Sequence, residues 1–149
     1  MQKIAINQLG RYAQNQALFF HEGALYTPEG HAGPFVLVQH YLDAGADAII
    51  EAFLWQELLL VVCGASVVTI LPQHHPAKWY IKDLPDQAVS RFLGGVQWLF
   101  WVTQTRFCSR TGEPLAYQSG LCEKRAVSGQ QTYYPSLAPA VLVVIKKLD

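Results

Sequence analysis

The organisation of this chain is decided by three runs: W-V-T-Q-T-R-F-C-S-R-T-G-E-P at 101–114, L-C-E-K-R at 121–125, and Y-Y-P-S-L-A-P-A-V-L-V-V-I at 133–145. Polar loops that contain glycine separate these runs, and the last run is apolar and β-branched, which is typical of a strand. Cys108 and Cys122 each open a short span that fits a turn. The sequence therefore predicts a small, loop-rich hairpin unit here.

The residues before this unit predict one long helix. Asp83-Leu84-Pro85-Asp86 is typical of a helix entry, with Asp86 near the N-cap. Gly94 and Gly95 fall in the middle, where each costs about 1 kcal/mol relative to alanine, and we expect them to allow close packing against a sheet. Six apolar residues recur at helical spacing as far as about Gln104: Val89, Phe92, Leu93, Val96, Leu99 and Phe100.

The first half of the chain predicts mainly strands. Two aromatic-rich runs flank Gly23 and predict a hairpin. The run at 58–71 is too short to span a membrane and is rich in β-branched residues, so it predicts two buried strands. Residues 46–57 fit either a strand or a helix. The candidate strands are 17–20, 24–26, 35–38, 48–55 and 58–70.

Three further features are interpreted structurally. His74-His75-Pro76 is expected in an exposed turn, and residues 78–85 as a passage from strand to turn in which Trp79-Tyr80 begins the strand. Trp98 and Trp101, three residues apart, are expected to pack the helix against the sheet.

This order of elements predicts an α+β fold: a small mixed sheet with one main helix, followed by a zinc-ribbon-like β-hairpin appendage. We expect residues 1–105 to form the N-terminal domain. Residues 106–149 then form the degenerate ribbon-like segment and the start of a strand.

Composition narrows the functional classes. Half of the 149 residues (51%) are apolar, which is enough for a core, and eleven Lys and Arg residues balance eleven Asp and Glu residues. Because the chain has no net charge to attract a polyanion, a nucleic-acid partner is unlikely and no membrane partner is expected. Three cysteines and no signal peptide predict a cytoplasmic protein. The basic residues around the cysteines are expected on a solvated loop face: Arg106, Arg110, Lys124 and Arg125.

The two cysteines are candidate metal ligands. A zinc ribbon holds its ion with two C-x-x-C turns, but Thr111 and Arg125 occupy the second position of each span, which leaves Cys108 and Cys122 as two of four expected ligands. Zinc thus remains a low-probability cofactor. The alternatives are that these thiols pack a metal-free hairpin or form a disulfide on oxidation. Cys63, in an apolar run, is expected to be an inert core thiol.

The motif W-x-x-x-x-R-F-C-x-x-x-G-E-P, the second L-C and the Y-Y-P-x-L-A-P-A-V-L-V-V-I block resemble the zinc-ribbon junction of the NADH pyrophosphatases, a branch of the Nudix hydrolases. Residues 16–30 also look like the N-terminal domain of that family. The resemblance implies a mixed N-terminal domain, a four-cysteine ribbon and a catalytic Nudix domain, commonly in a homodimer. It places Cys108 and Cys122 at the first and third zinc positions, and Thr111 and Arg125 at the second and fourth.

The resemblance also shows what is missing. The Nudix reaction needs a glutamate-rich helix that holds Mg²⁺ or Mn²⁺, whereas the six glutamates of this chain are all isolated. We therefore expect this chain alone to be inactive, with those metals relevant only if a Nudix domain is present elsewhere.

Three hypotheses follow. The chain is the non-catalytic portion of an NADH-pyrophosphatase-type protein, used for scaffolding, dimerisation or dinucleotide presentation to a Nudix domain in cis or in trans. Alternatively, it is a stand-alone binding or interaction module that has lost zinc and activity. A third hypothesis is an unrelated enzyme, for which Asp83 with Asp86, or His74 with His75, are the only paired candidates. The apolar run 140–145 would need a strand partner, which makes a homodimer plausible.

Overall fold

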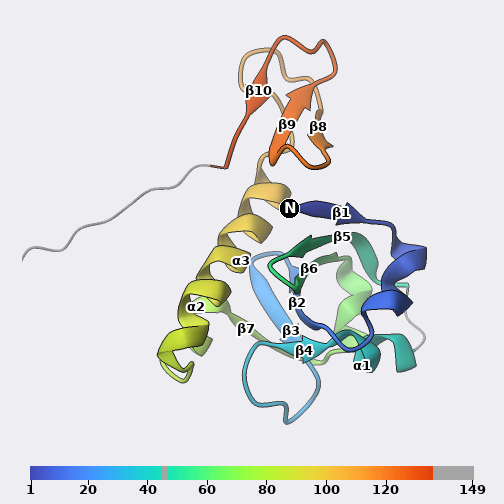
Figure 1. The fold of residues 1–149 in the computed structure, drawn as a ribbon, viewed down its shortest axis with the longest axis vertical. Coiled ribbons are helices and arrows are strands. Elements are labelled where there is room, and N and C mark those ends of the chain that lie inside the picture. The colour runs from blue at the N-terminus through green and yellow to red at the C-terminus, as the bar shows by residue number, and fades with distance from the viewer. Residues whose placement is uncertain (45–46, 136–149) are drawn as a thin grey trace, which may run out of the picture.

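The computed structural model of the chain describes residues 1–44 and 47–135 and shows a sheet-based body with a smaller sheet at one end (Figure 1). The larger sheet has the order β1-β5-β6-β2-β3-β7, with β4 paired to β2. Strands β2 and β6 run parallel and the other pairs antiparallel, so the sheet is mixed. Its strands are β1 (Gln2–Ile4), β2 (Gln16–His21), β3 (Ala24–Thr27), β4 (Val36–Leu37), β5 (Ile49–Trp55), β6 (Leu58–Cys63) and β7 (Gln73–Pro76).

One long helix and several short ones cover this sheet. Helix α3 (Asp86–Gln104) has 19 residues and is the main helix that the apolar spacing predicts. The shorter elements are the 3₁₀ helices η1 (Ile6–Tyr12) and η2 (Ala65–Thr69) and the α-helices α1 (Val38–Asp43) and α2 (Ala77–Ile81). This arrangement confirms the predicted α+β class.

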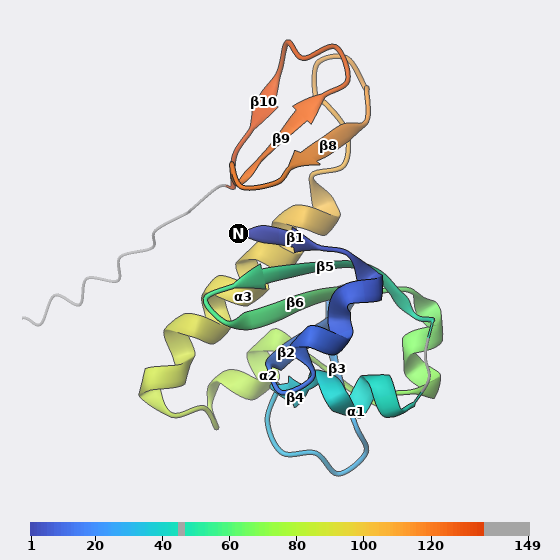
Figure 2. The ribbon, with the colours of Figure 1, turned by 45° about the vertical axis from the view of Figure 1, so that its right-hand side comes forward.

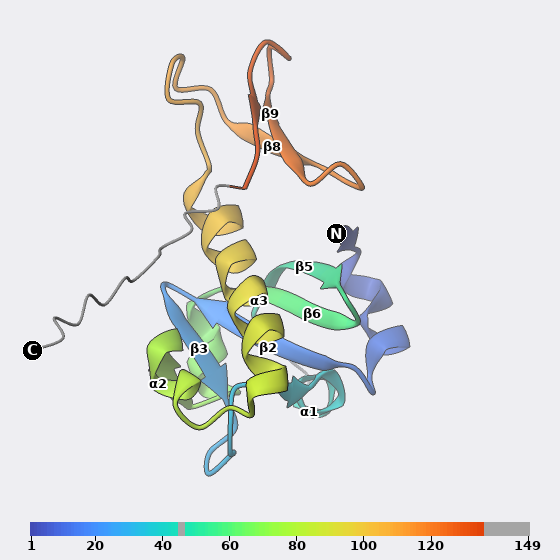
Figure 3. The ribbon, with the colours of Figure 1, turned by 60° about the vertical axis from the view of Figure 1, so that its left-hand side comes forward.

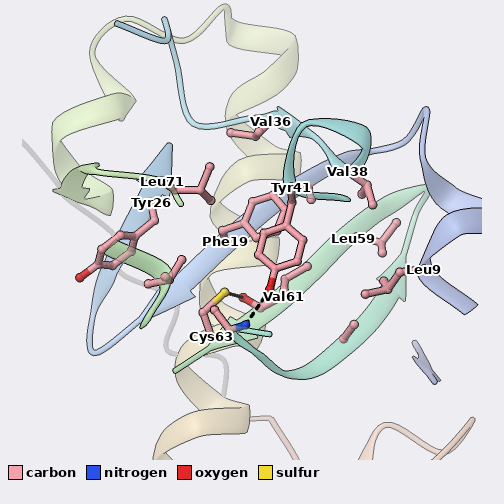
Figure 4. Close-up of a cluster of buried hydrophobic side chains, with 14 of the residues drawn as sticks. Leu9, Phe19, Tyr26, Val36, Val38, Tyr41, Leu59, Val61, Cys63 and Leu71 are labelled. Carbon is pink, nitrogen blue, oxygen red and sulfur yellow. Dashed lines mark hydrogen bonds between the residues drawn. The ribbon is translucent and has the colours of Figure 1, made fainter. Parts of the chain in front are cut away.

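The central strands β2 and β6 are buried on both faces, and their alternating side chains divide the core in two. From β2, Ala17 and Phe19 enter one cluster, while Leu18 and Phe20 enter the other. Elements η1, α1 and η2 cover the first face, where Phe19 stacks on Tyr41 with ring centroids 5.2 Å apart (Figure 4). Helices α2 and α3 cover the second face. Because both faces are covered, every residue of β6 is buried.

Glycines in α3 allow it to lie close to the sheet, as the sequence predicts. A Cβ atom on Gly94 would lie 2.4 Å from the ring of Trp55, and one on Gly95 would lie 3.0 Å from a methyl group of Leu60. Trp98 and Trp101 are partly buried against the same core and contact each other edge to face. The helix is therefore continuous, and its glycines serve packing.

Local predictions in the first half of the chain have mixed outcomes. The hairpin at Gly23 is confirmed, with His21 paired to Ala24 and positive φ angles at Glu22 (46°) and Gly23 (85°), as a tight hairpin turn requires. Residues 49–55 form a strand, which decides between the two alternatives for that run.

Three local predictions are wrong. The run 58–71 contains one strand, because β6 ends at Cys63 and η2 follows Gly64. Residues 78–85 do not begin with a strand, since α2 starts directly after Pro76 and includes Trp79. His74 and His75 lie in edge strand β7, paired with β3, and not in a turn. Each error concerns a short element that the sheet, rather than local propensity, determines.

The appendage is a three-stranded antiparallel sheet beyond the C-terminal end of α3 (Figures 2 and 3). Its order is β10-β9-β8, formed by β8 (Leu115–Gln118), β9 (Glu123–Ala126) and β10 (Thr132–Tyr133). The strand predicted at 140–145 lies outside the described residues. Within the described residues, no helix is both long and apolar enough to span a membrane.

Candidate functional site

The structure does not bring the two candidate zinc ligands together. Cys108 lies in the turn that precedes β8, where its amide donates to the carbonyl of Glu113 at 2.8 Å. Cys122 lies in the turn between β8 and β9, immediately before the Gln118–Glu123 pair. The Leu115–Ala126 pair closes the other end of that hairpin, on the side of Cys108. The two thiols are therefore at opposite ends of the β8–β9 hairpin.

The turn that faces Cys108 is instead residues 126–131, between β9 and β10. Each turn is closed by a backbone hydrogen bond from a glycine: the amide of Gly112 donates to the carbonyl of Cys108, four residues back, and the amide of Gly129 donates to the carbonyl of Ala126, three residues back, both at 2.8 Å. The facing turn reads A-V-S-G-Q-Q and has no Cys, His, Asp or Glu. Among the residues the structure describes, no group of three such side chains could hold a metal ion. The predicted pair thus receives no geometric support as a shared site.

Hydrogen bonds connect the two turns directly. The Glu113 carboxylate accepts from the hydroxyl of Thr111 at 2.8 Å and from that of Ser128 at 3.0 Å. The Tyr133 hydroxyl donates to the Cys108 sulfur at 3.3 Å. Hydrogen bonds from Thr111, then Tyr133, lower the pKa of the Cys108 thiol to about 7.

Cys122 has a different role. The amino group of Met1 donates to its sulfur at 3.3 Å, and the hydroxyl of Tyr117 donates to the carbonyl of Met1 at 3.0 Å. Burial, with a further contribution from Cys122, raises the pKa of Tyr117 to about 12. These contacts attach the first residue of the body to the appendage.

Lys124 makes the second attachment, and the prediction that it lies on a solvated loop face is wrong. Its side chain is buried, with 5% exposed, and its ammonium group donates to the carbonyls of Val102 (2.5 Å) and Thr105 (2.7 Å) at the end of α3. The same group lies 5.4 Å from the ring centre of Trp101. A cation at a helix C-terminus also interacts favourably with the helix dipole. Arg106, Arg110 and Arg125 are exposed, as predicted.

A groove lies along the joint between the body and the appendage. It has a volume of about 370 Å³, and its walls include Ile50 and Glu51 of β5, Thr103 of α3, Arg106 and Phe107 of the connecting segment, and Lys124 of β9. We call this the junction groove. A second cavity of about 420 Å³ adjoins it and shares Ile50, Thr103 and Arg106. Such volumes are typical of small-molecule sites.

Three ionisable groups near the groove have roles within the fold. The Glu51 carboxylate is paired with Lys3 at 2.5 Å. In the adjoining cavity, a ring nitrogen of His21 bonds the carbonyl of Cys63 at 2.8 Å. Burial raises the pKa of the Cys63 thiol to about 12, which fits the predicted inert core thiol.

The remaining paired candidates contribute no site. His74 stacks on Tyr26 at 5.1 Å and His75 stacks on Trp79 at 4.6 Å, on different partners. Asp83 and Asp86 are both exposed, and Asp86 lies in the first turn of α3, where a carboxylate favours the helix dipole. Their role is therefore structural.

Sequence reasoning missed the groups that shape the joint. Nothing in the sequence pairs Lys124 with α3, Cys122 with Met1, or Glu113 with Ser128, because each pair depends on tertiary register. The sequence carried no clear signal for the burial of Lys124: on β9 both Glu123 and Lys124 are buried and Arg125 is exposed, so the strand does not alternate simply between protein and solvent.

A scan against protein-family models gives no match to this chain, and no curated protein matches it significantly. The resemblance to the NADH pyrophosphatases therefore consists of the sequence motifs alone.

Proposed function

We propose that this chain is the non-catalytic N-terminal and ribbon-like portion of an NADH-pyrophosphatase-type Nudix protein. Its role is scaffolding, dimerisation or presentation of a dinucleotide to a Nudix domain in cis or in trans. The observation that supports this role is the joint itself: Lys124 and Cys122 fix the appendage on the body and leave a groove between them.

Local chemistry favours binding over catalysis at this joint. Pyrophosphate hydrolysis needs several carboxylates around a divalent ion. The junction groove offers only Glu51, which already pairs with Lys3. In the part of the chain that the structure describes, no cluster of three metal-binding side chains supplements it. The groove can therefore hold a ligand, while the chemistry would come from another domain.

The alternative is a stand-alone binding or interaction module that has lost zinc and pyrophosphatase activity. The observation in its favour is the hydrogen-bonded tip, where Glu113 joins the two turns without a metal. The coding sequence after Asp149 distinguishes the two. A following glutamate-rich Nudix helix supports the first proposal, and a stop codon with no such domain nearby supports the alternative.

The proposal is tested by assaying NADH hydrolysis with Mg²⁺ or Mn²⁺, using a complete NADH pyrophosphatase as positive control. We expect no turnover by this chain alone, because within residues 1–44 and 47–135 no carboxylate cluster could position a metal and water against the pyrophosphate. Turnover proportional to protein concentration, and retained after repurification, would refute it.

The proposal includes a homodimer in the cytoplasm. All three cysteines are unpaired, which suits a reducing compartment. Light scattering over a range of concentrations should give twice the mass of the 149-residue chain. A monomer mass at the highest concentration contradicts the dimer.

A further inference from the structure

We propose that the junction groove binds a small organic anion that carries a planar ring, with the anionic group between Arg106 and Lys124 and the ring against Phe107. This inference deepens the proposed function and rests on its presentation role. It names the wall of the groove that recognises the ligand and the class of ligand that fits.

Charge is the first argument. Arg106 lines both cavities, and among the described residues no carboxylate lies within ion-pair distance of it. Around the groove, three basic groups (Lys3, Arg106 and Lys124) face one carboxylate, Glu51, which is bound to Lys3. An anion between Arg106 and Lys124 would offset the remaining positive charge.

Lys124 has one N–H that makes no hydrogen bond among the described residues, and the Trp101 ring centre lies 5.4 Å from the same ammonium group. An ammonium group has three N–H donors, and the structure accounts for two of them, at the carbonyls of Val102 and Thr105. Burial lowers the pKa of Lys124, Glu51 opposes this, and the nearby Arg106 and Lys3 lower it further. A bound anion would relieve the repulsion between Arg106 and Lys124 and accept the third N–H of Lys124.

Apolar surface is the second argument. Phe107 and Ile50 both line the groove, and each is 59% exposed, which is high for large apolar side chains. The Arg106 guanidinium lies 5.9 Å from the centre of the Phe107 ring. An aromatic ring beside an unpaired arginine suits a ligand with a flat ring and an anionic group. Simple phosphate would leave this apolar surface uncovered.

The test uses adenosine 5′-monophosphate as a probe that combines a ring with a phosphate. Isothermal titration calorimetry compares it with adenosine, which lacks the anion, and with inorganic phosphate, which lacks the ring. We expect saturable binding of the monophosphate and at least about tenfold weaker binding of either part, because hydrogen bonds to a charged group contribute roughly a factor of ten or more.

Two variants locate the site. Arg106→Ala should weaken monophosphate binding about tenfold or more, whereas Arg110→Ala, the same change on an exposed arginine outside the groove, should leave it unchanged. Phe107→Ala should weaken binding of the monophosphate but not of phosphate. Arg106 and Phe107 are exposed, so both variants should keep the unfolding temperature, which is measured alongside.

Absence of saturable binding, equal affinities for the monophosphate and adenosine, or equal effects of the two arginine variants would overturn this site. Such a result with no NADH turnover leaves the non-catalytic proposal standing. NADH turnover refutes that proposal whatever the titrations show.

Discussion

At the scale of single residues, the three cysteines show how strongly surroundings determine thiol chemistry. Cys63 is enclosed in the core, where burial raises its pKa to about 12. Cys108 accepts a hydrogen bond from Tyr133, and hydrogen bonds lower its pKa to about 7. Because the ionised form of Cys108 is favoured in the folded protein, its contribution to stability is complete above the unfolded pKa of about 9 and is lost as the pH falls through about 7.

The Cys108 environment predicts a measurable titration. In a Cys122→Ser background, thiolate absorbance at 240 nm should rise with a midpoint near pH 7, while Cys63 stays protonated over this range. Tyr133→Phe removes a donor to the sulfur and should move the midpoint upward. Tyr134→Phe, at the exposed neighbouring tyrosine, is the matched control and should leave it in place. A midpoint near 9 in the parent protein contradicts the assignment.

At the scale of elements, α3 contains two residues of low helix propensity, Gly94 and Gly95, at the point where it packs closest to the sheet. Two adjacent glycines in its middle remove side-chain volume where Trp55, Leu18 and Leu60 lie closest to the helix backbone. Their cost is about 1 kcal/mol each in propensity, and the gain is a shorter distance between α3 and β6. The approach is tightest at Trp55.

Because helix propensity favours alanine at position 94 and the Trp55 ring excludes its Cβ atom, the effect of Gly94→Ala should depend on the residue at position 55. Gly94→Ala should destabilise the protein by about 1–3 kcal/mol, because its Cβ would lie 2.4 Å from the Trp55 ring. In a Trp55→Leu background the same change should stabilise by about 1 kcal/mol, since the obstruction is gone and only propensity remains. Urea unfolding of the four proteins measures this cycle. Equal effects of Gly94→Ala in both backgrounds would show that Trp55 does not limit the helix.

In the appendage, the hydrogen bonds of one side chain, Glu113, are expected to stabilise the tip. Glu113 accepts hydrogen bonds from both turns at its tip. Protein purified without chelators should contain far less than one zinc per chain by elemental analysis, and EDTA should not change its unfolding temperature. Glu113→Ala should lower that temperature, because two hydroxyl groups lose their acceptor. Stoichiometric zinc with a large EDTA effect would contradict a hydrogen-bonded tip.

At the scale of the whole molecule, several contacts join the body and the appendage, among them the Tyr117 ring against Phe53 of β5, with ring centroids 5.2 Å apart. The Met1 amino group contacts Cys122, and Lys124 caps the end of α3. Residues of both units line the junction groove, Lys124 and Tyr117 among them. Its shape therefore depends on both units keeping their relative position, and the connecting segment at Arg106 is the point where motion would be expected if a contact were lost.

Lys124→Met tests this joint. It keeps the length of the buried side chain but removes two charge-assisted hydrogen bonds, so we expect a loss of about 1–3 kcal/mol in stability and faster tryptic cleavage after Arg106. Lys78→Met, at an exposed lysine of α2, is the control. Cleavage at the parent rate in Lys124→Met would show that other contacts hold the appendage.

Much of the body could be predicted because its signals are local. The spacing of Val89 to Phe100 specified α3, and Gly23 between two aromatic runs specified the β2–β3 hairpin. The short elements were missed for a physical reason: β7 with its histidines exists because β3 offers it a pairing edge, and α2 begins directly after Pro76, the last residue of that strand and the N-cap of the helix.

By itself, the sequence determined the fold class, the main helix, the inert Cys63 and the shortage of zinc ligands, because these follow from periodicity, composition and the chemistry of individual side chains. Tertiary structure alone decided that Cys108 and Cys122 lie at opposite ends of a hairpin, that Lys124 is buried at the end of α3, and that a groove separates the two units. The reason is that strand register and helix packing bring together residues whose proximity no local pattern encodes.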